Sequence, residues 1–221
     1  MAVNLDKLHF WKAGISQSVD MYNNWFMDFA PNAFRETRVA VTKDVEATLI
    51  ATENLTSITP DILRKYPEVL PTLRMATFPP LAVDRLIGLA SVSSSLVKRM
   101  EKEKKMPVRL QGKELDIELR KIGKIIERMA DLDIFTWLDQ AKLPSSADVY
   151  RAATVIADRL CGSVANPIIR NAQERRQLAA IQQWLERKKY KRLSEKDGTK
   201  FDKSLLLTNT ITTLNKSGKS G

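Results

Sequence analysis

The sequence predicts a mainly α protein, and three features support this fold class. Apolar residues recur at spacings of three and four along most of the first 190 residues, as they do on one face of an amphipathic helix. Only one segment has a convincing β pattern: residues 204–214 alternate like a β-strand and are rich in leucine and threonine. The 221 residues are 43% hydrophobic and 28% charged, a balance typical of a folded protein with a substantial core.

Two helices are expected before residue 53. The first should end at Pro31, because proline cannot continue a helix ladder, and the second should begin with Asn32 as its N-cap and run to about Thr52. Packed as an antiparallel pair, they would bury their apolar stripes in a core. The first stripe is Leu8, Trp11, Ile15, Val19, Tyr22, Phe26 and Phe29, and the second is Phe34, Val41, Val45, Leu49 and Ile50.

Prolines divide the next segment, so residues 54–92 should form short helical pieces and not one long helix. The charge run KRMEKEKK at 98–105 is expected to be a solvated helix end and loop. A helix should follow Gly112, because apolar residues beyond it share one helix face. These residues are Leu115, Leu119, Ile122, Ile126 and Met129.

Helix signals resume at Ser145 or Ser146 and predict a helix over about 146–161. Pro167 suits the first turn of a further helix over about 167–190, which the strand at 204–214 would follow. We therefore divide the chain into a helical N-terminal region, 1–144, and a second region, 145–221. The inward residues of the helix at 146–161 are expected to be Val149, Ala152, Ala153, Ile156 and Leu160.

The positive charge is concentrated near the end of the chain. The formal net charge is +10, and residues 170–221 hold thirteen cations against five anions. This distribution favours a nucleic-acid partner, while a solvated helix face followed by a polar tail remains an equal alternative.

Several function classes are excluded by simple counts. Cys161 is the single cysteine and His9 the single histidine, so an internal disulfide, a cysteine zinc site and a histidine-based hydrolytic triad are not expected. No apolar run approaches the 18 or so residues that span a bilayer, and the start of the chain does not resemble a signal peptide. The sequence therefore predicts a cytoplasmic protein with no membrane partner.

Formal matches to catalytic motifs are weak. The Gly-Lys-Ser trio at 218–220 lacks the earlier glycine of a phosphate loop, because Thr213 stands at that position. Asp61 with Glu103-Lys104-Lys105, and the triplet at 186–188, match a metal-nuclease pattern only in helical or loop contexts.

Glu174 leads an apolar stripe formed by Leu178, Ile181 and Leu185 on the helix from Pro167. One interpretation is an acid near a helix start, stabilised by the helix dipole and by Arg170. The other is a carboxylate that points toward a metal ion or a neighbouring catalytic strand.

Three segments together resemble the XamI family of type II restriction endonucleases: MYNNWFMDFAPNAFRETR at 21–38, LPTLRMATFPPLAVDRLIGLA at 70–90, and YRAATVIADRLCGSVANPIIRNAQERRQLAAIQQWLERKKY at 150–190. The resemblance implies a bacterial enzyme that cuts double-stranded DNA with Mg²⁺. It also implies a nuclease core of the PD-(D/E)xK type, in which an acid-bearing helix precedes the metal-binding strands. Glu174 and the strand at 204–214 fit the opening of such a core.

The sequence departs from this family pattern after the strand, where a metal-binding Asp and a Glu-x-Lys are expected. We therefore expect an incomplete α/β core of the restriction-endonuclease type and a truncated, catalytically incomplete copy. An unfinished sheet would leave an exposed strand edge, which predicts aggregation or a homodimer. The alternative is a non-enzymatic basic helical protein that binds DNA or another partner at this length.

In the family setting, DNA contacts are expected from basic side chains on phosphates and polar groups on base edges. Arg74, Arg85 and Arg159 could equally be structural partners of Asp84 or Asp158, and this alternative stays open. The DNA-binding candidates are Arg170, Asn171, Gln173, Arg175, Arg176, Arg74 and Arg85.

Overall fold

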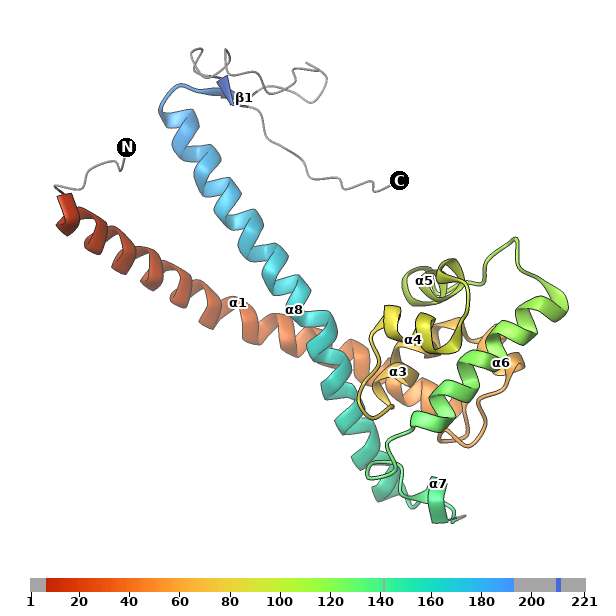
Figure 1. The fold of residues 1–221 in the computed structure, drawn as a ribbon. Helices are drawn as coiled ribbons and strands as arrows, with labels where there is room; N and C mark the ends of the chain where they lie inside the picture. Colours follow the sequence, from red (N-terminus) through yellow and green to blue (C-terminus); the bar gives the residue numbers. More distant parts are fainter. Residues whose placement is uncertain (1–6, 141, 193–209, 212–221) are drawn as a thin grey trace. The chain divides into compact units, whose positions relative to one another are not determined.

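The computed structural model describes residues 7–140, 142–192 and 210–211, and it is mainly α, as predicted (Figure 1). The chain divides into two compact units, Met1–Pro167 (unit 1) and Ile168–Gly221 (unit 2). Unit 1 contains α1 (Leu8–Ala51), α2 (Pro60–Lys65), the 3-10 helix η2 (Pro67–Val69), α3 (Leu70–Met75), α4 (Val83–Ala90), α5 (Ser94–Glu103), α6 (Gly112–Met129), α7 (Trp137–Gln140) and the first part of α8 (Ser146–Arg187).

Helix α1 is continuous through Pro31, so the predicted antiparallel pair of helices does not exist (Figure 1). Proline at this position leaves the carbonyl of Met27 without its helical N–H donor. Met27 and Pro31 are both exposed, so water can bind that carbonyl. Asn32, the predicted N-cap, instead donates its side-chain amide to the carbonyl of Asp28 at 3.0 Å within the same helix. The cost of the proline is therefore reduced where it stands.

The two apolar stripes of α1 have different surroundings. Val41, Val45 and Leu49 are buried, as predicted, whereas Ile50 is 80% exposed. The first stripe is not a core, and this prediction is wrong: Trp11 is 53% and Ile15 61% exposed. Continuity through Pro31 removes the turn that would have folded this half of the helix back onto the other.

The core of unit 1 lies among the short helices and α6. Leu63, Leu73, Leu86 and Leu96 are fully buried there, although their helices have ten residues or fewer. On α6 the predicted face is confirmed, since Leu115, Leu119, Ile122 and Ile126 are buried and Met129 packs against the core.

Gly123 sets how closely α6 approaches the segment before α2. A Cβ atom at this position would lie 2.8 Å from the carbonyl oxygen of Ile58. No side chain fits there, so the glycine permits a backbone approach that fixes which face of α6 is turned inward.

Helix α8 begins with a reciprocal capping box. The hydroxyl of Ser145 accepts the N–H of Asp148 at 3.2 Å and lies 2.7 Å from its carboxylate, which also accepts the N–H of Ser145. These hydrogen bonds, from the side chain and then the backbone of Ser145, lower the pKa of Asp148 below its ordinary value.

The helices predicted at 146–161 and 167–190 are one helix, because α8 continues through Pro167. Ser163, whose carbonyl loses its helical donor, is exposed, as is the proline. The predicted inward residues Ala152, Ala153, Ile156 and Leu160 are buried within unit 1, and Val149 packs against its core. The two compact units divide inside α8, at Pro167, and the division of the chain at residue 144 stays a prediction.

Unit 2 contains the rest of α8 and two short parallel strands. Lys191 of β1 (Lys191–Arg192) pairs with Thr210 of β2 (Thr210–Ile211), and Arg192 pairs with Ile211. The predicted strand at 204–214 is thus seen at 210–211, and its other residues lie outside the described part. Among the described residues, no helix is long and apolar enough to cross a membrane.

Candidate nucleic-acid interface

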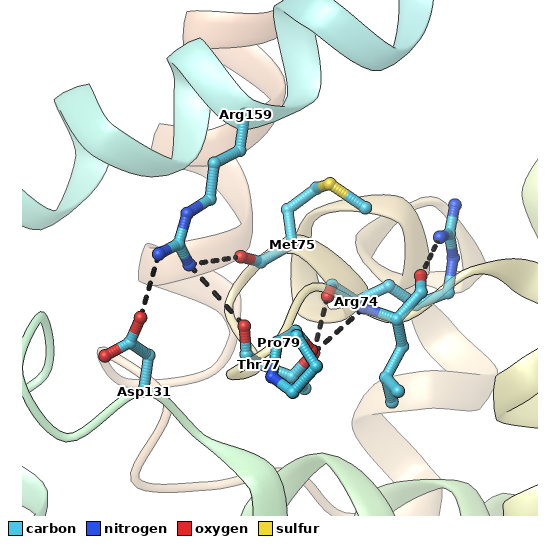
Figure 2. A network of polar contacts seen from close by, with 7 residues as sticks. Arg74, Met75, Thr77, Pro79, Asp131 and Arg159 are labelled. Atoms are coloured by element: carbon cyan, nitrogen blue, oxygen red, sulfur yellow. Dashed lines mark hydrogen bonds and ion pairs between the residues drawn. The ribbon is translucent and has the colours of Figure 1, made fainter.

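Arg74, a predicted DNA contact, is engaged inside unit 1 (Figure 2). Its side chain is buried, with Nε and Nη2 bound to the carboxylate of Glu101 on α5, the latter at 2.8 Å. Nη1 donates to the carbonyl of Leu81. The partner is therefore Glu101 and neither Asp84 nor Asp158. Such contacts join α3, α5 and the loop before α4, which is a structural role.

The loop between α3 and α4 is held from both sides. The hydroxyl of Thr77 lies 2.8 Å from the carbonyl of Arg74 and 2.9 Å from that of Pro79, and it accepts the N–H of Leu81. The N–H of Phe78 donates to the carbonyl of Met129 at the end of α6. The loop also contains a cis Phe78–Pro79 peptide, and it presents the Phe78 side chain 66% exposed.

Arg159 on the first part of α8 fastens the same loop (Figure 2). Its Nη2 lies 2.9 Å from the buried carboxylate of Asp131, and its Nη1 donates to the carbonyl of Met75 at 3.1 Å. Asp158, the neighbouring acid that had been an alternative partner, pairs with Arg38 of α1. Arg159 is therefore engaged within the fold, but its partner is Asp131 and neither Asp84 nor Asp158.

Arg85, by contrast, remains available for a ligand. It is exposed on α4, and within the described residues it forms no hydrogen bond or ion pair. A guanidinium in this state keeps all of its donors for an anion.

The other DNA-binding candidates follow one another along α8 in unit 2. Because each residue turns the helix by about 100°, they surround it and do not form one face. Asn171 and Arg175 lie about 40° apart on one side, and Gln173 and Arg176 lie about 60° apart on another. The Nε of Arg175 donates to the carbonyl of Asn171 at 3.3 Å. One DNA groove could therefore meet only part of this set.

Glu174 is exposed on α8, and among the described residues no ion pair joins it to Arg170. The apolar residues that follow on its face are not covered in unit 2, since Leu178 and Ile181 are each 55% exposed.

The described residues contain no cluster of three or more His, Cys, Asp or Glu side chains arranged to hold a metal. The acids of the formal nuclease matches have other partners there: Asp61 pairs with Arg64, and Glu103 pairs with Arg99. Glu186 accepts a hydrogen bond from Gln182.

The sequence analysis did not identify a stripe of cations on the exposed face of α6. These residues, here called the α6 basic stripe, are Lys113, Arg120, Lys121, Lys124 and Arg128. Their spacing of i, i+7, i+8, i+11 and i+15 could have identified them, because it places them on the side of the helix opposite its apolar residues.

Comparison with known proteins gives two matches. Residues 53–211 match the family described as XamI restriction endonuclease. The chain is 48% identical over 183 residues to the type II restriction enzyme SalI of Streptomyces albus G, an alignment that covers 83% of this chain and 58% of the relative. The chain therefore spans a little over half of that relative's length. No solved structure matches.

Proposed function

The chain belongs to the XamI restriction endonuclease family, and from this premise we propose that it binds double-stranded DNA as part of a type II restriction endonuclease. Such an enzyme serves a bacterial restriction-modification system and cuts both strands at a short recognition sequence with Mg²⁺. Its place of action would be the bacterial cytoplasm. The observation that supports this proposal is the 48% identity over 183 residues to a type II restriction enzyme.

The proposed DNA contacts lie on α4 and α8. Arg85 and Arg170 are exposed and form no ion pair within the described residues, so they are suited to phosphate oxygens. Asn171 and Gln173 carry amides, which pair in two-pronged fashion with adenine edges in the major groove. Arg175 lies on the same side of α8 as Asn171, and Arg176 on the same side as Gln173. Each arginine would bind a DNA phosphate next to the base that the amide contacts.

Magnesium chemistry is proposed for the family enzyme. Mg²⁺ would neutralise the phosphate and activate water. Glu174 is proposed as an auxiliary acid only. We propose that this chain by itself binds DNA without cutting it.

We further propose that the chain forms a homodimer through one apolar face of α1, which is exposed at Leu8, Trp11 and Ile15 and half-buried at Tyr22, Trp25 and Phe29. Leu8, Trp11, Ile15, Tyr22 and Phe29 recur at the heptad spacing of two-stranded coiled coils, with Ser18 at one position. Trp25 completes the pattern and stacks on Phe29 with ring centroids 5.1 Å apart. A second copy offers the same stripe, and mutual burial would remove large aromatic groups from water.

The experiment that tests the proposed function measures binding of purified chain to a mixed-sequence DNA duplex in EDTA. Long bacterial DNA is then incubated with the same preparation in Mg²⁺ and run on a gel. We expect duplex binding and no cleavage. Cleavage would show that the metal site must be sought among the acids of this chain, beginning with Asp61 and Glu103. Absence of binding would contradict the proposal.

A further inference from the structure

Helix α6 has two faces with opposite chemistry. Its buried face packs on the core of unit 1 through Leu115, Leu119, Ile122 and Ile126. The α6 basic stripe lies on the opposite side, because its five positions fall within about 100° of one another around the helix axis. Between these cations stands one apolar residue, Ile117, which is 54% exposed.

The rotation of α6 about its axis is fixed by packing. Gly123 lies against the carbonyl of Ile58, which leaves no room for a Cβ atom, and α6 also packs against α2 and α4. All five cations are exposed. The stripe is therefore presented on a rigid element and does not depend on a loop conformation.

The cations of the stripe have no acidic partners. Within the described part of the chain, none of the five forms an ion pair or a side-chain hydrogen bond. Two acids of α6 are engaged elsewhere, since Asp116 pairs with Arg64 and Glu118 accepts the N–H of Ser93. Glu114 and Glu127 are exposed at the two borders of the stripe. The stripe itself holds five positive charges and no negative one.

We propose that the α6 basic stripe binds the phosphate backbone of double-stranded DNA. This inference rests on the proposed function and adds to it a second surface, on a different unit from the contacts of α8. From Lys113 to Arg128 the stripe runs about 22 Å along the helix. That length corresponds to about six base pairs of duplex at 3.4 Å each. Phosphate contacts of this kind fix the position of a protein on DNA without reading its sequence.

A lipid surface fits the stripe less well. Membrane-binding helices combine basic residues with a broad apolar face that enters the bilayer, and the apolar face of α6 is already buried in the core. Ile117 alone does not replace it. An acidic protein would match the charge, and the experiment below separates that partner from DNA.

The test compares two triple variants of the full chain with the same change in charge. The first, Arg120→Gln, Lys124→Gln and Arg128→Gln, removes the centre of the stripe. The matched control, Lys98→Gln, Lys102→Gln and Lys105→Gln, removes exposed cations in and after α5 that have no partner within the described residues. Glutamine keeps a comparable helix propensity, and circular dichroism checks that each variant folds.

Binding to a mixed-sequence duplex is then measured over a range of salt concentrations. Each lost phosphate contact should change the slope of log affinity against log salt by about 0.9. The stripe variant should therefore show a slope shallower by about 2 to 3 and an affinity at least about tenfold lower at low salt, equally for unrelated sequences. The control should resemble the parent chain.

The outcomes separate the two proposals. If the parent binds DNA and the stripe variant binds with the same slope, the stripe is not a DNA surface and the inference is overturned, while the proposed function stands. Equal losses in both variants would also overturn it, because the effect would then be one of net charge. If the parent does not bind duplex DNA, the proposed function itself fails.

Discussion

Arg74 and Glu101 form a two-pronged ion pair that joins α3 to α5, with Nη2 and Oε2 2.8 Å apart. Their side chains are only 9% and 11% exposed. Arginine is the expected residue at such a position, because its planar fork matches a carboxylate and it stays charged. The same fork would suit a phosphate, which explains why the sequence alone suggested a DNA contact.

Arg74→Ala should lower the stability of unit 1 by about 3 kcal/mol, since it leaves a nearly buried carboxylate without its partner. Arg85→Ala, at an exposed position, should change stability by less than about 0.5 kcal/mol and weaken duplex binding. Chemical denaturation and DNA titration measure the two effects. If the Arg74→Ala chain were as stable as the parent but bound DNA more weakly, Arg74 would be a DNA contact and not a structural residue.

Gly123→Ala should destabilise unit 1 by about 1 to 3 kcal/mol, because the added methyl would meet the Ile58 carbonyl at 2.8 Å. Gly88 on α4 offers the matched control, since nothing lies within 4 Å of a Cβ atom there. Gly88→Ala should leave stability equal or raise it by up to about 1 kcal/mol. Equal effects in thermal unfolding would mean that α6 does not approach Ile58 as described.

Asp148→Asn should destabilise the chain near neutral pH, and this difference should disappear in acid. The folded pKa of Asp148 is lowered from 3.8 by its hydrogen bonds with Ser145, so its contribution is present above 3.8 and lost as the pH falls through the folded value. Thermal unfolding at pH 6 and at successively lower pH measures it. Asp133→Asn, at an exposed acid, is the control. A difference that persists in strong acid would contradict the capping role.

Ile15→Lys should convert the proposed homodimer to a monomer, because it places a charge on the apolar face of α1 that is proposed as the dimer interface. Gln17→Lys adds the same charge on the opposite side of the helix and should leave the dimer intact. Sedimentation equilibrium of the parent and both variants gives the molecular masses. A parent chain with the mass of a monomer would contradict the proposed homodimer.

Periodicity predicted the helical character of the chain and much of the core correctly, whereas the helix ends predicted at Pro31 and before Pro167 were wrong. The inward residues of α6 and of the first part of α8 were identified from spacing, because burial of one face repeats with the helical turn. Spacing identifies a face but not what covers it, and for this reason the stripe of Trp11 and Ile15 was placed in a core that does not exist.

The prolines and the arginines show two further limits of the sequence. Pro31 and Pro167 stand where both the proline and the residue that loses its donor are exposed, so each helix continues at lower cost than in a buried setting. Arg74 and Arg159 find their acids 27 and 28 residues away, at Glu101 and Asp131. Such partners are brought together by tertiary packing, whereas the sequence pointed to Asp84 and Asp158 because they are close to these arginines along the chain.

Binding of duplex DNA by this chain is tested most directly by measuring its affinity for a mixed-sequence duplex between about 50 and 200 mM salt. We expect a linear fall of log affinity with log salt whose slope corresponds to at least five phosphate contacts, about −4.5 or steeper. An affinity that is absent, or that does not change with salt, would contradict it.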